Sequence, residues 1–230
     1  MTLSLTERRK AETRMEIARA AAGLFVRHGL RATRAEDIAH AAGIAPRTFY
    51  RYFATKEEAV APLYAAGADL WAEAVREAPA DLSVPQALEH AVRHTLSPGA
   101  GVSASSWEWV RTLLRLTEAS PGLRRVWAEV CHASERTLAE ILAERLEILA
   151  ERLDRRPTPD ADNVAESLAA SPELRYAAAV ASAAVRTAIE TWVAGDAPAD
   201  GPEGPAGLAL RNLGALGDFI WEGVRGGRTT

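Results

Sequence analysis

The fold is decided by residues 33–57, which read TRAEDIAHAAGIAPRTFYRYFATKE. Two short helices are predicted in this stretch, because Gly43 ends the first with a tight turn and Pro46 suits the first turn of the second. In the second helix Phe49 and Phe53 are four residues apart and therefore share one face, which is the expected buried side. Two short helices joined by a glycine turn indicate a helix-turn-helix.

Two Thr-x-x-Glu patterns mark expected helix starts in the same region. Thr33 with Glu36 is expected to cap the first short helix, and Thr55 with Glu58 is expected to cap the helix that follows the second. A longer helix is predicted ahead of them over Thr6 to His28, with a glycine after it as a left-handed stop. The first three helices therefore form an N-terminal domain.

The outward face of the second short helix carries the chemistry of interest. The spacing that buries its phenylalanines leaves Arg47, Thr48 and Arg51 outward, flanked by Tyr50 and Tyr52. Arginine makes bidentate contacts to guanine, threonine contacts the methyl group of thymine, and tyrosine hydroxyls bind phosphate. The pattern predicts a helix that reads the major groove, and it also fits a helical hairpin whose charges are only solvated.

The net charge of −4 conceals a division along the chain. Residues 1–56 contain 11 Arg and Lys against 5 Asp and Glu, whereas the remaining residues contain 16 against 26. The N-terminal part is basic and the rest of the chain is acidic. This indicates that the N-terminal part (the head) binds a polyanion and that the rest of the chain does not. A charged, solvated terminus would account for the same numbers.

These residues resemble the DNA-binding signature of the TetR family of bacterial regulators. The shared residues are Thr33, Asp37-Ile38-Ala39, Ala42-Gly43-Ile44-Ala45, Thr48-Phe49-Tyr50, Tyr52-Phe53 and Lys56-Glu57. The resemblance covers about residues 10–60, a quarter of the chain. It implies phosphate contacts by Thr33, Arg34, Tyr50 and Lys56. It implies base-edge contacts by Arg47, Thr48, Arg51 and Tyr52. The family often has a capping serine where this chain has Ala45, and the loss of such a cap costs on the order of 1 kcal/mol.

The rest of the chain is expected to be helical as well, because apolar residues recur at three- and four-residue spacing and strand alternation never persists. Further helices are predicted over residues 56–77, 84–96, 105–119, 123–153, 174–194 and 206–225. Two stretches rich in Pro, Gly and Asp, 155–160 and 195–205, are expected to be mobile. The predicted protein is all-α with about nine helices: a DNA-binding domain over 1–55 and a larger ligand-binding and dimerisation domain over 56–230.

Small residues line the last two predicted helices and suggest a dimer contact. Small faces permit close helix approach, so two helix pairs are expected to form a four-helix bundle about a two-fold axis. The expected interface residues are Ala177, Ala181, Ala184, Leu213, Gly217 and Ile220. The resemblance favours a homodimer, because palindromic operators require two heads. The general abundance of alanine in the chain is the alternative explanation.

A small-molecule site is expected among the helices that surround a cavity in the family. The candidate residues are Trp71, His94, Trp107, Arg111, Trp127 and Cys131. Each of them also fits an ordinary core position. Because such a pocket is mostly apolar, the effector is expected to be a hydrophobic or amphipathic small molecule. No cofactor or metal is expected, since His90 and His94 lack a third ligand nearby in sequence.

The sequence also argues against other classes of protein. It contains no nucleophile motif and no phosphate-binding glycine loop, so an enzyme is not expected. No apolar run reaches the roughly 18 residues of a spanning helix, and the polar start lacks the apolar core of a signal peptide, so a cytoplasmic location is expected. We predict a ligand-responsive repressor released from a palindromic operator by its effector. The alternatives are an activator, a corepressor-dependent regulator, a helical enzyme or a scaffold protein.

Overall fold

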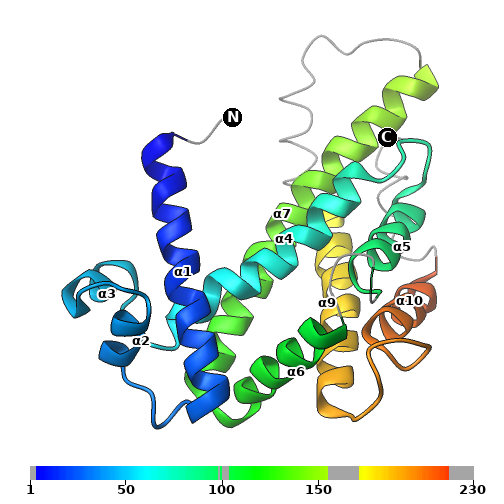
Figure 1. Cartoon of the computed structure of the whole chain (residues 1–230). Helices are drawn as coiled ribbons and strands as arrows, with labels where there is room; N and C mark the ends of the chain where they lie inside the picture. Colours follow the sequence, from blue (N-terminus) through cyan, green and yellow to red (C-terminus); the bar gives the residue numbers. More distant parts are fainter. Residues whose placement is uncertain (1–3, 98, 100–103, 155–170, 218–230) are drawn as a thin grey trace. The chain divides into compact units, whose positions relative to one another are not determined.

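A computed structural model describes residues 4–97, 99, 104–154 and 171–217. In these ranges the chain forms nine α-helices and one short 3-10 helix, with no strand, so the all-α prediction is confirmed (Figure 1). The elements are α1 (Leu5–His28), α2 (Ala35–Ala41), α3 (Pro46–Tyr52), η1 (Glu58–Val60), α4 (Ala61–Glu77), α5 (Val84–Thr95), α6 (Ala104–Ala119), α7 (Pro121–Asp154), α9 (Pro172–Ala194) and α10 (Pro205–Leu216).

The chain divides into two compact units. The first comprises residues 1–67 and 109–130, and the second comprises residues 68–108 and 131–230. These units reflect which residues pack together, and they do not show which residues bind DNA or a ligand. The functional boundary between residues 55 and 56 therefore stays a prediction.

The first unit is built on α1. Its buried face carries Ile17, Ala21 and Phe25, which recur at helical spacing and pack under α2 and η1. In turn α2 packs on α3, whose Phe49 is fully buried. Burying a phenylalanine or isoleucine side chain is worth about 1.5–3 kcal/mol, so these few residues hold the short helices in place. On their own, helices as short as α2 and α3 are not stable in water.

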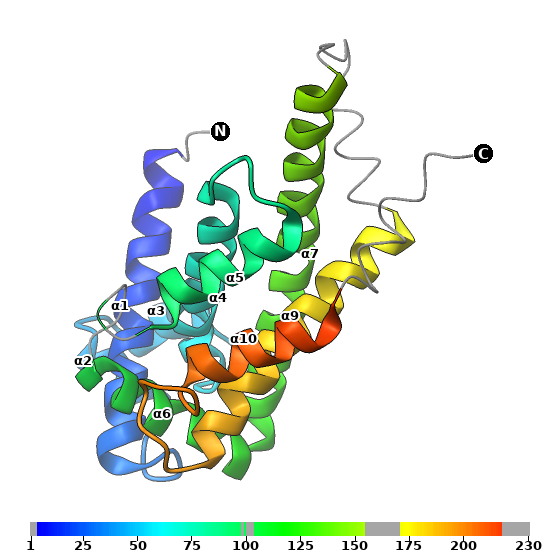
Figure 2. The same cartoon turned by 90° about the vertical axis from the view of Figure 1, so that its right-hand side faces the viewer.

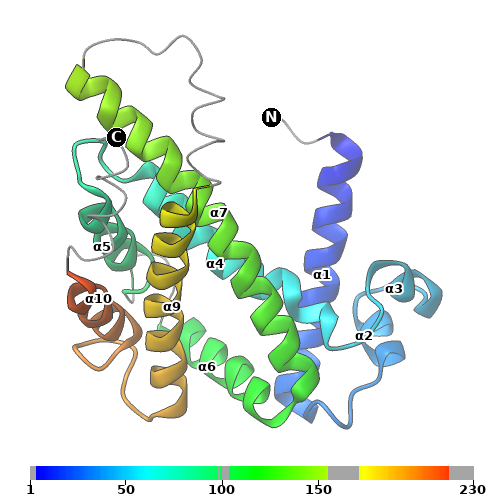
Figure 3. The ribbon, with the colours of Figure 1, turned by 180° about the vertical axis from the view of Figure 1, so that it is seen from behind.

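The second unit is built on α9, which packs against α10 while α10 also packs on α5. Figure 2 shows α10 lying across α9. The Asn212 side-chain amide of α10 donates a hydrogen bond of 2.9 Å to the Ala184 carbonyl of α9. In the same unit the second half of α7 lies beside the second half of α4 (Figures 1 and 3), where the Arg145 guanidinium reaches the Val75 carbonyl.

The connection between α9 and α10 is ordered, so the expectation that residues 195–205 are mobile was wrong. The indole N–H of Trp192 donates to the carbonyls of Ala197 (3.0 Å) and Pro198 (3.1 Å). At Gly204 a side chain would collide with the backbone of Ala199, so the loop closes tightly upon itself. Composition alone predicts mobility here, but the single N–H of a buried indole, shared between two carbonyls, ties the loop to α9.

Some predictions concern residues outside the described ranges. These are the mobile stretch 155–160, Ile220, and the end of the last helix beyond residue 217. In the part of the chain that the structure describes, no helix has the length and apolar character needed to cross a membrane. Over those same ranges, no cluster of three or more His, Cys, Asp or Glu residues is arranged to hold a metal ion.

Candidate nucleic-acid interface

The helix-turn-helix is formed by α2, the turn at Gly43 and α3. Gly43 has a φ of +69°, a left-handed conformation that an L residue rarely adopts, and it redirects the chain between the two helices. Pro46 is the first residue of α3, where its missing N–H has no cost. Ala45 is the N-cap of α3 and supplies no side-chain hydrogen bond, as expected for alanine.

One face of α3 is buried and the opposite face is open. Phe49 and Phe53 are 0% and 3% exposed, with ring centroids 5.9 Å apart. Arg47 and Arg51 are exposed and Tyr50 is 52% exposed. The outward groups are therefore guanidinium and phenol groups on a helix whose opposite face is packed into the core. Such an arrangement is suited to contacts with base edges and phosphates in a major groove.

The half-buried residues of α3 have specific neighbours. The Arg51 guanidinium lies 5.4 Å from the centroid of the Tyr52 ring, within the range of a cation–π contact. Thr48 is half-buried, and its amide donates to the Ala45 carbonyl at 2.8 Å. Tyr52 is also only half-exposed, so of the predicted base-contacting residues the two arginines are the most accessible.

Tyr50 and Glu36 connect α3 to α2. The Tyr50 hydroxyl donates a hydrogen bond to the Glu36 carboxylate at 3.3 Å. Partial desolvation and then the negative charge of Glu36 raise the pKa of Tyr50, which therefore stays a neutral donor. A neutral phenol is suited to a phosphate oxygen.

The predicted capping box of α2 was wrong by one residue. The N-cap is Arg34 rather than Thr33, and the amide of Arg34 donates to the Asp37 carboxylate at 2.8 Å. Thr33 is 2% exposed, and its hydroxyl donates to the Gly29 carbonyl at 2.9 Å. Sequence reasoning chose the commoner Thr-x-x-Glu pattern, whereas Thr33 closes the turn before the helix.

At the start of η1 the predicted Thr55 to Glu58 box is present in part. The Glu58 amide donates to the Thr55 hydroxyl at 3.3 Å, and the Glu58 carboxylate accepts from the Ala54 amide at 3.0 Å. The Lys56 ammonium, between these residues, donates to the carbonyls of Leu30 (2.6 Å) and Thr33 (2.8 Å). Lys56 is therefore engaged with the α1–α2 turn in the free protein.

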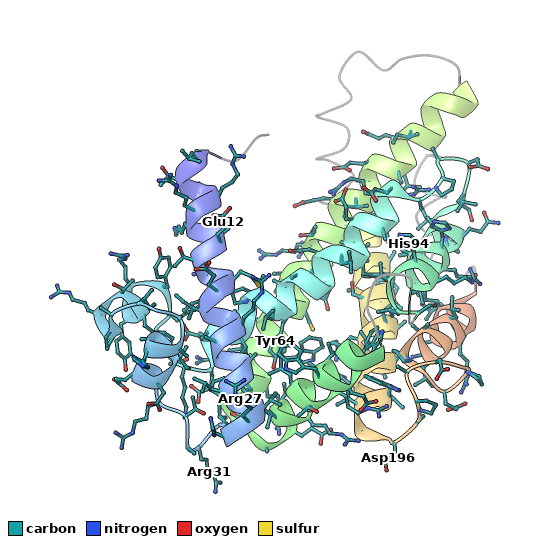
Figure 4. The ribbon with its side chains drawn as sticks, in the orientation of Figure 1. Glu12, Arg27, Arg31, Tyr64, His94 and Asp196 are labelled. Carbon is teal, nitrogen blue, oxygen red and sulfur yellow. The ribbon has the colours of Figure 1, made fainter. Side chains whose placement is uncertain are left out.

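Sequence reasoning missed Arg14 on α1. Its guanidinium donates to the Tyr52 carbonyl at the end of α3 at 3.1 Å and lies 4.6 Å from the centroid of the Phe53 ring. Spacing gave no signal for this contact, because Arg14 and Tyr52 are 38 residues apart. Figure 4 shows another arginine, Arg31 in the α1–α2 turn, with its side chain extended away from the helices.

The predicted effector residues belong to two different units. Trp71, His94, Trp107 and Cys131 are in the second unit, and Arg111 and Trp127 are in the first. Trp71, Trp107 and Arg111 are buried, Trp127 and Cys131 are half-buried, and His94 is exposed. The exposed His94 (Figure 4) stacks on His90, with ring centroids 6.3 Å apart.

Two of these tryptophans pack against aromatic residues that were not predicted. Trp107 meets Trp192 edge to face with ring centroids 5.4 Å apart, and Trp127 meets Tyr64 in the same way at 5.3 Å. Burial raises the pKa of Cys131 to about 12. Its thiol is therefore protonated at neutral pH.

The predicted dimer residues are mostly internal to the second unit. Ala177 and Ala181 are 0% exposed and Leu213 is 8% exposed, so their side chains already pack within one chain. Ala184 is half-buried, and Gly217 is exposed with a φ of +53°. The small residues of α9 and α10 therefore permit the close packing of these two helices within one chain.

The helix-turn-helix region is similar to known regulatory proteins. Residues 17–61 match the model of the bacterial regulatory proteins of the tetR family. The HTH-type transcriptional regulator TcmR of Streptomyces glaucescens is 33% identical over 146 residues, which span 61% of this chain and 63% of TcmR.

Two solved structures share the fold. A TetR-family regulator from Mesorhizobium loti has a TM-score of 0.52 at 20% identity, over 90% of this chain and 96% of that one. The Thermus thermophilus repressor FadR, in complex with lauroyl-CoA, has a TM-score of 0.51 at 23% identity, over 91% of this chain and 94% of that one. All three proteins are described as transcriptional regulators and none as an enzyme. This chain is therefore similar to the bacterial regulatory proteins of the tetR family over residues 17–61, and it is similar to TcmR over 61% of its length.

Proposed function

We propose that this chain is a DNA-binding transcriptional regulator. The observation that carries the proposal is the two-sided α3, which buries Phe49 and Phe53 while exposing Arg47, Tyr50 and Arg51. A solvated helical hairpin needs no such concentration of base-reading side chains on one face. A regulator of this kind acts where the bacterial chromosome lies, in the cytoplasm.

A homodimeric repressor on a palindromic operator is the form we propose. FadR is described as a transcriptional repressor, which supports the repressor part of this proposal by likeness of fold. Two heads bind two half-sites and double the number of phosphate contacts, so a dimer binds more tightly than a single head.

We also propose a small-molecule effector in the second unit. The indole N–H groups of Trp71 and Trp107 are buried and meet no acceptor among the residues that the structure describes. An indole only donates, and a buried donor without a partner costs about 1–3 kcal/mol. An apolar molecule with oxygen acceptors would satisfy both groups. The lauroyl-CoA in FadR supports a ligand by likeness of fold alone.

Selection of duplexes from a random-sequence DNA library tests the proposed function. The expected result is an enriched palindromic sequence, bound by the full chain at least about a thousandfold more tightly than an unrelated duplex of equal length. Fluorescence anisotropy at several salt concentrations measures both affinities. Binding without any enriched sequence would contradict the regulator proposal and favour a non-specific scaffold.

The same assay tests the repressor mechanism once a duplex is selected. Lauroyl-CoA and compounds that quench tryptophan fluorescence are the probes. An effector that releases the repressor is expected to weaken binding to the selected duplex by about 5–150-fold, and the duplex must weaken effector binding by the same factor. A probe that tightens binding would favour a corepressor and would leave the DNA-binding proposal intact.

A further inference from the structure

The geometry points to Lys56 as a positioning residue that holds the first turn of α2 in place for DNA binding. This inference rests on the proposed DNA-binding function, but it concerns the free protein. The Lys56 ammonium lies 2.6 Å from the Leu30 carbonyl oxygen and 2.8 Å from the Thr33 carbonyl oxygen. Both are charge-assisted hydrogen bonds to main chain, which are stronger than neutral ones.

These two bonds complete a polar cluster in the α1–α2 turn. Thr33 donates its hydroxyl to the Gly29 carbonyl at 2.9 Å, and its amide to the Leu30 carbonyl at 3.4 Å. Because Thr33 is 2% exposed, its carbonyl needs a donor from the protein, and Lys56 supplies one. The turn that carries the chain from α1 into α2 therefore depends on a side chain 23 residues further along.

Both polar groups of the peptide between Thr33 and Arg34 are hydrogen-bonded. Its carbonyl accepts from Lys56, and its N–H, which belongs to Arg34, donates to the Asp37 carboxylate at 2.8 Å. This peptide directly precedes α2, so its orientation sets the direction of that helix. Lys56 thus links the start of the η1–α4 segment to the start of the helix-turn-helix.

An ammonium group has three N–H donors, and the turn uses two of them. One donor remains for a DNA phosphate oxygen. The phosphate contact that the family resemblance implies and the positioning role are therefore compatible, and they make different predictions. Loss of a phosphate contact lowers the affinity for every DNA sequence by a similar factor. Misplacement of α2 and α3 lowers mainly the affinity for the specific sequence.

The chain offers a matched control, since Lys10 and Lys56 are its only lysines. Lys10 is exposed on α1. Lys56→Met and Lys10→Met remove the same charge, but only the first removes the donors in the turn. Lys56→Arg keeps both the charge and several N–H donors, and it is expected to restore most of the lost function.

Hydrogen exchange of the free protein is the first measurement. Lys56→Met is expected to raise the exchange rate of the Thr33 and Arg34 amides by about tenfold or more, because the turn opens without its charge-assisted bonds. Lys10→Met should leave these amides unchanged. Unchanged exchange in Lys56→Met would overturn the inference.

The second measurement is affinity for the duplex selected by the wild-type protein and for an unrelated duplex. Lys56→Met is expected to lower the ratio of the two affinities by about tenfold, and Lys56→Arg to recover it. An equal loss on both duplexes with Lys56→Met would leave only a phosphate contact and would overturn the positioning role. If Lys56→Met does not fold, Lys56→Gln takes its place. Its side chain keeps an amide donor of shorter reach. The same changes in amide exchange and in the ratio of the two affinities are expected of it. If the wild-type protein selects no duplex, the proposed function fails, and the exchange experiment still decides the state of the turn.

Discussion

At the scale of single residues, Arg47 is the clearest candidate for reading a base. It is exposed at the second position of α3, next to Pro46. Arg47→Ala is expected to lose about 1–3 kcal/mol of binding to the selected duplex and to relax the preference at one base pair. Arg19→Ala, which removes an exposed arginine of α1, serves as the control. A uniform loss on all duplexes with Arg47→Ala would assign Arg47 to phosphate instead.

The single cysteine gives a prediction about pH. Burial raises the pKa of Cys131 to about 12, above its ordinary value of 9.0. The thiolate is the reactive form, so iodoacetamide at pH 8 should modify the folded protein at least about tenfold more slowly than the unfolded protein in denaturant. Equal rates would contradict the assigned pKa.

The same shift has a definite sign for stability. Between pH 9 and 12 the unfolded chain loses the thiol proton before the folded chain does. The unfolded state then binds fewer protons, so this group's contribution to the free energy of unfolding falls as the pH rises through that window. Cys131→Ala removes the contribution and serves as the control.

At the scale of elements, Arg145 of α7 closes the end of α4. Its guanidinium donates to the carbonyls of Ala78 (2.8 Å), Pro79 (2.9 Å), Val75 (3.2 Å) and Leu82 (3.2 Å), and the side chain is 4% exposed. The last carbonyls of a helix have no partners within it, so they need such donors.

Replacement of Arg145 therefore tests how α4 is anchored. Arg145→Met is expected to lower the free energy of unfolding by about 2–4 kcal/mol, because several carbonyls lose their donor. Arg136→Met, at an exposed position of the same helix, should change it by less than about 0.5 kcal/mol. Urea unfolding measures both values. Equal effects of the two substitutions would show that the contacts of Arg145 do not anchor α4.

At the scale of the whole molecule, the proposed dimer must use the outward faces of α9 and α10. A charge at Ala181 would be buried within one chain, and a side chain at Gly217 would be strained by its positive φ. At Gly214 on α10 a side chain would meet nothing within 4 Å, so Gly214→Arg fits the single chain. Light scattering is expected to show monomers for this variant, with weaker binding to the selected duplex.

Gly67→Arg on α4 is the control for the dimer prediction. Gly67 also has open space around it, so the substitution adds the same charge without a steric conflict in the single chain. A dimeric mass for Gly214→Arg would place the interface elsewhere. Monomers for both variants would show a general effect of the added charge rather than a contact at α10.

The sequence by itself determined the helices and the helix-turn-helix, because both depend on local signals. Periodic apolar residues, Gly43 in a left-handed turn and Pro46 at a helix start act within a few residues of chain. The outward face of α3 follows from the same periodicity, so the arginines of the candidate interface were predictable.

Only the tertiary structure decided which polar groups meet across the chain. The Lys56 bonds to the α1–α2 turn, the Arg14 bond to the end of α3 and the Trp192 bonds that order the next loop leave no periodic trace in the sequence. It also decided that Ala177 and Ala181 pack inside the unit rather than on its surface. Small residues permit close approach by any helix, and which helix approaches depends on how the whole chain folds.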